Sequence, residues 1–574
     1  MGSLIYARLV LPVRGSYAET MKGKNPSLLL PDMTDTREVD QFVATGVDNR
    51  DLARPPVEDV DERVYEHSHK WLIATAVMLG TTLEVLDTSI MNVSLPHMQG
   101  AFSASVDEIT WVLTSYLLAN GIMIPMTAWI SSRFGRKRYF LISMITFVLA
   151  SGLCGAARSL DQMVMFRFLQ GLAGAAMVPS SQAIMMESFP PQEQAMAMAT
   201  WGLGIMAAPI IGPTLGGWIT DNWSWRWNFY INLPVGAIAV LMVSAFVHDP
   251  EFLRKRRAVG GRVDYLGIAL LVVGLSSLQI VIDRGQRADW FTAPWVCWTS
   301  ALAVLSLIGL VVRELIFPEP IIDFRILKIP DFTIAVALVV SMFFVSYGGS
   351  VLNPIFLQEY LGYSAMTAGL TMAPRAIAMV ISLIVVGQLA RLNFDTRFTV
   401  AIGFMLSAFG LWQMSHFELR MGIWNFIMPS IYQGVGSGMI FPTLSAATLS
   451  CVARERVGFA SSLYSMLRNN FAALAVAYLS TTLVTREQVH QNYLTQHYTV
   501  FEHWRIIGSP GYGSHLGTSA TGAIALLYHG IQAQAAMLSF NDLFRILAFI
   551  AVVLIPGPFL LRRSGAGAQT AAAH

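Results

Sequence analysis

The sequence predicts an all-α polytopic membrane protein, built from two six-helix bundles with two further helices inserted between them. Three observations predict it: the composition, a series of about fourteen long apolar segments, and an internal repeat. Of the 574 residues, 54% are hydrophobic and 13% are charged, whereas soluble proteins carry about 25% charged residues. The net charge of +2 indicates no nucleic-acid partner. The chain therefore has too little polar surface to be covered by water alone, and we expect lipid around much of it.

The apolar segments have the length that a membrane helix needs. A helix crosses a hydrocarbon core of ~30 Å with about 20 residues, and backbone groups in lipid must bond within their own segment, which favours helices. The alternating pattern of a membrane barrel is absent from the sequence. The predicted spans are 71–95, 111–131, 139–157, 163–186, 196–219, 228–247, 265–283, 294–312, 332–357, 366–389, 398–416, 424–449, 457–484 and 544–561.

Lysine and arginine residues indicate the orientation. They cluster after even-numbered spans, as in 133–138 after the second and 254–262 after the sixth. Positively charged loops stay in the cytoplasm. We therefore expect both termini to be cytoplasmic.

A repeat relates the fourth and twelfth spans. Gln170-Gly171 precedes Pro179 in one, and Gln433-Gly434 precedes Pro442 at the same spacing in the other. The two spans are equivalent if the seventh and eighth are an insertion, and two facing six-helix halves are a transporter architecture. The predicted divisions are a disordered cytoplasmic tail (1–70), a first bundle (71–247), the insert with its flanking loops (248–331), a second bundle (332–561) and a short cytoplasmic tail (562–574). The second bundle includes a long outer connection (485–541).

Ionisable residues inside the spans are few, and each is a functional candidate because burial in lipid costs about 2.5–3.5 kcal/mol. Glu84 and Asp87 are three residues apart and share a helix face. Two neighbouring carboxylates at low dielectric do not both ionise readily, so we expect the pair to exchange protons or to attract a cationic substrate. Arg167 is the candidate partner that couples to them. A purely structural, arginine-paired site is the alternative.

Three more polar residues are assigned to the substrate cavity with the two acids. Arg375 follows a proline that can bend its helix, Arg468 lies in the middle of its span, and Asn92 lies in the first span.

The fifth span is rich in glycine and proline. Small residues four apart let a neighbouring helix approach closely, and prolines remove helix hydrogen bonds. This predicts either tight packing or a hinge between the halves, formed by Gly204, Pro209, Gly212, Pro213, Gly216 and Gly217.

Catalysis and metal binding are not indicated. The histidines of the outer connection have irregular spacings, and the sequence contains neither a phosphate-binding loop nor a nucleophile elbow. A membrane enzyme or receptor is thus disfavoured. We expect no metal and no cofactor beyond a proton gradient.

Several motifs carry a resemblance to a known family. They are Leu86-Asp87-Thr88-Ser89-Ile90-Met91-Asn92, Arg167-Phe168-Leu169-Gln170-Gly171, the glycine-proline span, Trp225-Arg226-Trp227 with Ile231-Asn232-Leu233-Pro234, and Asp283-Arg284-Gly285. Over about 71–561 the chain resembles the fourteen-span drug:proton antiporters of the major facilitator superfamily, of the EmrB/QacA type. The resemblance implies the major facilitator fold and proton-coupled multidrug efflux by alternating access. Its substrates would be hydrophobic or amphiphilic toxic compounds, and it would confer antibiotic resistance.

The loop after the second span departs from the family pattern. Arg133, Gly135, Arg136 and Lys137 are retained as a cytoplasmic gate loop, but Ser132 stands where the family has an acid. The resemblance also implies the bacterial inner membrane, with a periplasmic adaptor and an outer-membrane channel as candidate partners. A transporter that exports or imports one specific metabolite on the same fold stays open as an alternative.

Overall fold

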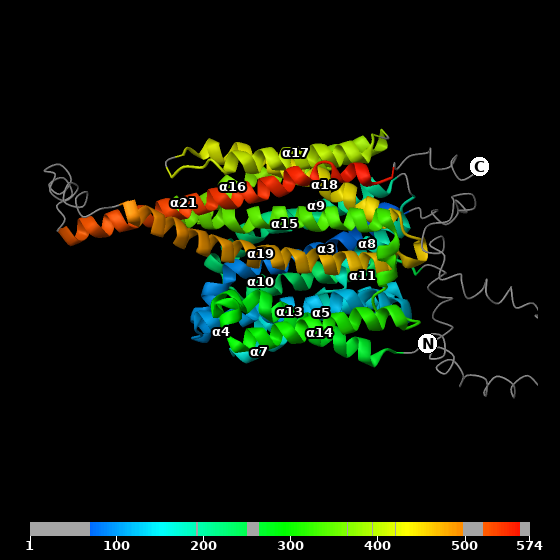
Figure 1. Cartoon of the computed structure of the whole chain (residues 1–574). Helices are drawn as coiled ribbons and strands as arrows, with labels where there is room; N and C mark the ends of the chain where they lie inside the picture. Colours follow the sequence, from blue (N-terminus) through cyan, green and yellow to red (C-terminus); the bar gives the residue numbers. More distant parts are fainter. Residues whose placement is uncertain are drawn as a thin grey trace, which may run out of the picture. The chain divides into compact units, whose positions relative to one another are not determined.

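The structure, a computed structural model, describes residues 69–190, 193–249, 263–363, 365–392, 394–419, 421–497 and 520–562. Its elements are helices, and most of them run side by side (Figure 1). The predicted tails 1–70 and 562–574 fall almost wholly outside the described residues, as does part of the outer connection.

Helices occupy all or most of each of the fourteen predicted ranges. The first half contains α3 (Lys70–Phe102), α4 (Val106–Ile109), α5 (Trp111–Phe134), α6 (Arg136–Ala156), α7 (Leu160–Gly174), α8 (Met177–Ser188), α9 (Gln194–Asn222), α10 (Trp227–Tyr230) and α11 (Asn232–Phe246). The insert contains α13 (Tyr265–Arg284) and α14 (Pro294–Ile316). The second half contains α15 (Pro330–Ile355), α16 (Ala365–Arg391), α17 (Thr396–Met414), α18 (Ile423–Ser450), α19 (Val457–His497) and α21 (Ala520–Leu554).

Eight helical stretches in the described part are long and apolar enough, taken alone, to cross a membrane. The remaining predicted spans include α9 and α18, which carry many glycines and prolines, and the broken pair α7 and α8. These segments lie among other helices, where packing rather than apolar character holds them in place.

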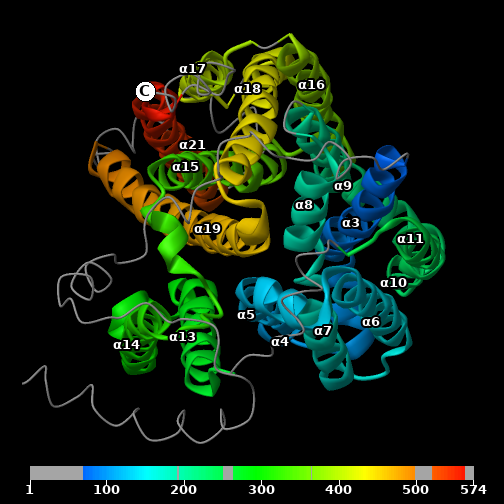
Figure 2. The same ribbon diagram turned by 90° about the vertical axis from the view of Figure 1, so that its right-hand side faces the viewer.

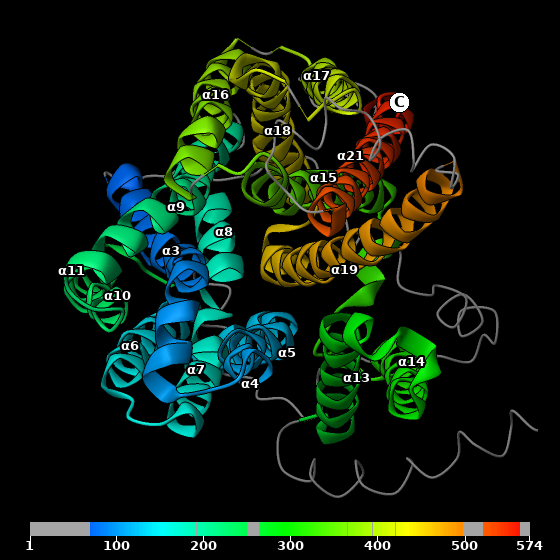
Figure 3. The same cartoon turned by 90° about the vertical axis from the view of Figure 1, so that its left-hand side faces the viewer.

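The helices separate into two groups when seen end-on. Figures 2 and 3 show α3 to α11 on one side and α15 to α21 on the other, with α13 and α14 at the edge. The insert contacts α5 of the first half and α19 of the second. The prediction of two six-helix bundles with two inserted helices is confirmed.

Local sequence explains several helix ends. Ser159 accepts a hydrogen bond from the backbone N–H of Gln162 and caps α7, and Asp264 accepts one from Gly267 and caps α13. Such caps satisfy N–H groups that a helix start leaves unpaired. Gly135 has φ 95°, a backbone conformation that favours glycine, and it separates α5 from α6.

The internal repeat is visible as a repeated close approach between helices. A Cβ added at Gly171 on α7 would lie 2.4 Å from the carbonyl oxygen of Tyr116 on α5. A Cβ added at Gly434 on α18 would lie 2.2 Å from the carbonyl oxygen of Arg375 on α16. Equivalent glycines thus let equivalent helices touch in each half, and Arg375 occupies the place that Tyr116 has in the first half.

The long outer connection is helical at both of its described ends. The sequence placed the last two spans at 457–484 and 544–561, whereas α19 runs on to His497 and α21 already begins at Ala520. Figure 1 shows the two helices reaching beyond the others at one end. The extension of α19 is polar, so hydropathy missed it, whereas the extension of α21 is largely apolar up to Asn541 and Asp542. The two extensions contact each other through His490 and Asp542 at 2.9 Å.

Three residues at the end of α13 and just after it fasten the insert to both halves. On the first half, Thr114 donates to Asp283 at 2.5 Å and Arg284 donates to Thr110 at 3.2 Å. On the second half, the Trp290 indole N–H donates to Thr481 of α19 at 3.1 Å. Asp283, Arg284 and Trp290 together therefore link α5 to α19 through the insert, and we call these contacts the insert bridge.

Candidate functional site

Asp87 on α3 lies at the centre of a buried polar cluster. Its Oδ2 is 2.6 Å from Nη1 of Arg167 on α7. The side chain of Arg167 is 0% exposed and that of Asp87 is 1% exposed. Its Oδ1 accepts hydrogen bonds from Gln170 and from Asn232, each at 2.9 Å. The structure thus brings together the acid and the arginine that the sequence singled out.

Arg167 is held from several sides. Its Nη1 also donates to Gln170 at 2.8 Å, its Nε donates to the carbonyl oxygen of Val112 at 3.4 Å, and its guanidinium lies 4.4 Å from the ring centre of Tyr116. A buried arginine cannot release its proton, so its charge requires a counter-charge. Asp87 supplies this counter-charge in the arrangement observed.

Glu84 lies on the same face of α3 in a less complete environment. Its Oε1 accepts from Tyr116 at 3.4 Å and from Asn120 at 3.1 Å, while its Oε2 has no hydrogen-bond partner among the described residues. Only 9% of the residue is exposed. One carboxylate oxygen of Glu84 is therefore available to a proton or to a ligand.

Arg468 lies on α19, in the second half, and its positive charge acts on Glu84. Its guanidinium donates to Asn469 at 3.2 Å and lies over the rings of Tyr464 and Phe343. Glu84 and Arg468 are thus opposite charges on different halves, although no ion pair joins them among the described contacts.

Arg375 and Asn92, the two other residues assigned to the substrate cavity, make no described contact with Glu84 or Asp87. Arg375 is half-buried and donates to the carbonyl oxygen of Ser346 at 3.4 Å. Asn92 lies on α3, but the position of its side chain is outside the described structure. Their assignment stays a prediction.

The glycines of α9 pack against α3, the helix that carries both acids. A Cβ at Gly204 would lie 2.5 Å from Met78, one at Gly212 2.5 Å from Ser89, and one at Gly216 2.8 Å from Ile90. Gly217 is half-buried, and the side chains of Pro209 and Pro213 are outside the described structure. These contacts lie within the first half, so the described geometry supports tight packing; the predicted hinge is untested.

The two halves meet at the end of the bundle where α3 begins. The Ala128 N–H donates to Ser462 at 3.1 Å, and Ser461 donates to Gln182 at 3.0 Å and to the carbonyl oxygen of Pro179 at 2.9 Å. These bonds join α5 and α8 to the first turns of α19. The structure is therefore closed between the halves at this end.

The predicted gate loop lies at the same closed end. Arg136 forms a buried ion pair with Glu187, and a Cβ at Gly458 of α19 would lie 2.7 Å from Arg136. The Lys137 N–H donates to Asp249 at 2.7 Å, and Arg133 lies 3.7 Å from Glu319. Ser132 donates within its own helix, so the negative charges at this loop come from other segments, namely Glu187, Asp249 and Glu319.

Sequence reasoning missed several members of the site. Asn232 and Tyr116 hold the two acids, yet neither carries a charge that would mark it in an apolar segment. Asn232 and Gln170 do occur in the family motifs quoted for the sequence, which was the available signal. Within the described residues no group of metal-ligating side chains occurs.

Comparisons with known proteins agree with this arrangement. Residues 77–477 match the model of the Major Facilitator Superfamily. The chain is 35% identical to the multidrug export protein EmrB of Escherichia coli K12, over 84% of this chain and 94% of the relative. It is 33% identical to the fatty acid resistance protein FarB of Neisseria gonorrhoeae, over 86% and 97%. Among solved structures, the human organic anion transporter MFSD10 superposes with a TM-score of 0.56 at 14% identity, covering 84% of this chain and 99% of that chain.

Proposed function

Since the chain belongs to the Major Facilitator Superfamily, in the branch of the EmrB proteins, we propose that this membrane transporter expels hydrophobic and amphiphilic toxic compounds in exchange for protons. The observation that carries the proposal is the buried pair of Asp87 and Arg167 beside the half-partnered Glu84. It is a secondary active transporter and not an enzyme.

Proton exchange follows from the electrostatics of the pair. While Asp87 is ionised, it neutralises Arg167 and ties α3 to α7. A proton on Asp87 removes that neutralisation and leaves a buried arginine charge, which is costly. Protonation therefore favours a rearrangement in which Arg167 finds another partner or water, and this rearrangement is the step that couples protons to transport.

Alternating access determines the direction in which protons and substrate cross the membrane. The halves are closed at the end where α3 begins. We propose that the acids are reached from the opposite side, that this side is the periplasm, that both termini are cytoplasmic and that the membrane is the inner membrane. A proton then enters from outside and leaves to the cytoplasm after the halves have switched.

The driving force is sufficient for useful accumulation. A membrane potential of 100 mV supplies about 2.3 kcal/mol per charge, and each pH unit adds about 1.4 kcal/mol. Because about 1.4 kcal/mol corresponds to a tenfold ratio, one proton sustains a substrate gradient of about a hundredfold or more.

Charges of both signs lie at the site and bear on the substrate class. Glu84 suits a cationic amphiphile, and Arg468 suits an anionic one. The related proteins carry names that refer to multidrug export, to fatty acid resistance and to colistin resistance. We therefore propose a broad range of amphiphiles. Export of one specific metabolite is the competing possibility, and it predicts that a single compound in a toxic panel is affected.

The extensions of α19 and α21 are a candidate surface for a periplasmic adaptor. They leave the bundle on the side opposite the closed end (Figure 1). The described surface of the α19 extension carries polar side chains such as Gln491 and Thr495. Shortening both helices by two turns should leave transport in liposomes unchanged and abolish resistance in cells if an adaptor binds there.

The test of the proposed function uses the purified chain in liposomes that contain a pH-sensitive dye. An exchanger changes the internal pH when a substrate is added, and the Asp87→Asn variant should not. Substrate movement with no change of internal pH in the wild type would contradict the proposal.

A further inference from the structure

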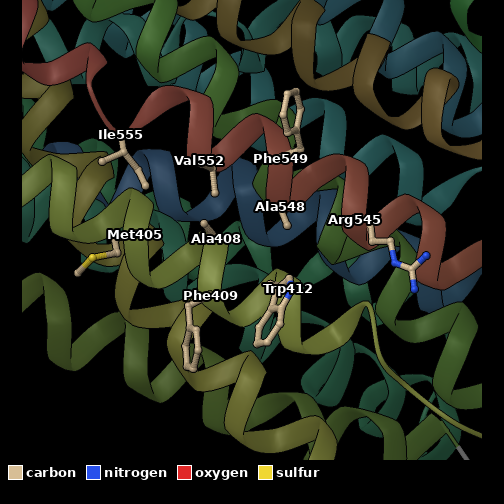
Figure 4. A pocket seen from close by; sticks show the side chains of 9 residues that line it. All are labelled: Met405, Ala408, Phe409, Trp412, Arg545, Ala548, Phe549, Val552 and Ile555. Atoms are coloured by element: carbon tan, nitrogen blue, oxygen red, sulfur yellow. The ribbon is translucent and has the colours of Figure 1, made fainter.

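An apolar groove lies on the outer face of the second half, between α17 and α21. Figure 4 shows the lining residues, with Arg545 as the one charged side chain, at one end. The groove has a volume of about 440 Å³ and is lined by Met405, Ala408, Phe409, Trp412, Arg545, Ala548, Phe549, Val552 and Ile555. It lies on a different surface from the cluster around Asp87.

The groove faces outward. Trp412 is 55% exposed, Phe549 68% and Val552 51%. Its floor is formed by Ala408 and Ala548, which are both buried and small. Small residues in the floor between large exposed ones on the walls give the groove its depth. A surface of this kind is in contact with hydrocarbon in a membrane protein.

Arg545 is the one charged residue that lines this surface. Its side chain is 60% exposed. The predicted span begins at residue 544, so Arg545 lies near the boundary of the hydrocarbon core. Its long side chain reaches the headgroup region, where an anion is a favourable partner.

The protein itself satisfies this charge only in part. Arg545 lies 3.8 Å from Asp542. The same carboxylate accepts from His490 at 2.9 Å and lies 3.7 Å from Arg486. Two arginines thus share one carboxylate in these contacts, and the closest interaction of that carboxylate is with a histidine.

We propose that the groove binds an anionic phospholipid from the leaflet on the side of the helical extensions. Its phosphodiester lies at Arg545, and one acyl chain lies along Phe409, Val552 and the alanine floor. The arginine recognises the negative headgroup through charge-assisted hydrogen bonds to the phosphate oxygens. A zwitterionic lipid can fill the apolar part but leaves the charge of Arg545 less well neutralised.

The experiment measures lipid retained by the full chain. The protein is purified in detergent, incubated with vesicles of phosphatidylglycerol or of phosphatidylcholine, and examined by native mass spectrometry. The expected result is preferential binding of one phosphatidylglycerol, and about a fivefold loss of that preference in Arg545→Gln. Arg562→Gln is the matched control, because Arg562 is 84% exposed at the other end of this segment and also lies 3.8 Å from an aspartate.

A second variant tests the groove separately from the charge. Val552→Trp fills an exposed wall position and should reduce retention of both lipids. An excess of inorganic phosphate should not displace the phosphatidylglycerol, because the acyl chain contributes to binding. The proposal is overturned if Arg545→Gln retains phosphatidylglycerol like the wild type, if Arg562→Gln loses as much, or if phosphate alone releases it.

Discussion

Replacing Asp87 by asparagine separates the electrostatic role of this residue from its packing role. The new side chain has the same shape, so Gln170 and Asn232 still find an acceptor oxygen. The other branch becomes an NH₂ group in place of the oxygen that lies 2.6 Å from Arg167. Two donors then face each other, and a fully buried arginine loses its counter-charge.

The size of the effect follows from the burial of the pair. Removing one partner of a buried ion pair costs about 3–5 kcal/mol, whereas removing both partners is often nearly neutral. We expect Asp87→Asn and Arg167→Gln each to lower the free energy of unfolding by about 3–5 kcal/mol. The double variant should recover most of this loss, because no uncompensated charge is left.

The assay combines unfolding in mixed micelles with proton exchange in liposomes. The double variant should be stable and yet unable to exchange protons for substrate. Ser151, which accepts from Asn232 at 3.0 Å, offers a control, since Ser151→Ala disturbs the same cluster without changing its charge. The reasoning is refuted if the double variant is as unstable as the single ones, or if Asp87→Asn exchanges protons normally.

Three further predictions concern other parts of the chain. Glu84→Gln should weaken transport of cationic compounds at least tenfold more than that of neutral ones, as measured by uptake into liposomes; equal losses would count against a charge-recognition role. Trp290→Phe should destabilise the contact of the insert with α19 by about 1 kcal/mol, and combining it with Thr481→Val should add nothing further in unfolding experiments. Burial raises the pKa of Asp264, but hydrogen bonds from Arg313 and from backbone N–H groups outweigh this and hold the pKa below its ordinary value. The stabilisation by Asp264 is therefore complete above its unfolded pKa of about 4 and is lost as the pH falls through the lower folded value. Asp264→Asn should reduce this part of the acid sensitivity in unfolding curves recorded from pH 7 to pH 3, and an unchanged curve would exclude it.

The arrangement of the helices could be predicted because its causes are local. Apolar segments of membrane length and the repeated Gln-Gly pairs are visible in the sequence without knowledge of any contact. The helical extensions beyond 484 and before 544 were not predicted. The first is polar and carries no hydropathy signal, and the polar residues around Asp542, which contacts His490, separated the second from the predicted span.

The candidate site could be predicted only in its charged members. Asp87 and Arg167 stand out because charge is rare in apolar segments, and the structure places them in contact. Asn232, Tyr116 and Asn120 are neutral, and only the fold brings them to the acids. The pairing of Arg136 with Glu187 depends on two segments about fifty residues apart meeting at the closed end, which no local pattern reveals.

The two halves share a framework but not its chemistry. Gly171 and Gly434 allow the same close approach of two helices, yet the glutamines that precede them differ in their hydrogen bonds. Gln170 binds Asp87, whereas neither amide atom of the buried Gln433 has a hydrogen-bond partner among the described residues. The two halves are thus two copies of one scaffold, and among the described residues the buried ion pair of Asp87 and Arg167 has no counterpart at Gln433. Introducing an acid near Gln433 would test whether the second half can also bind and release a proton, so that both halves of the transporter would titrate.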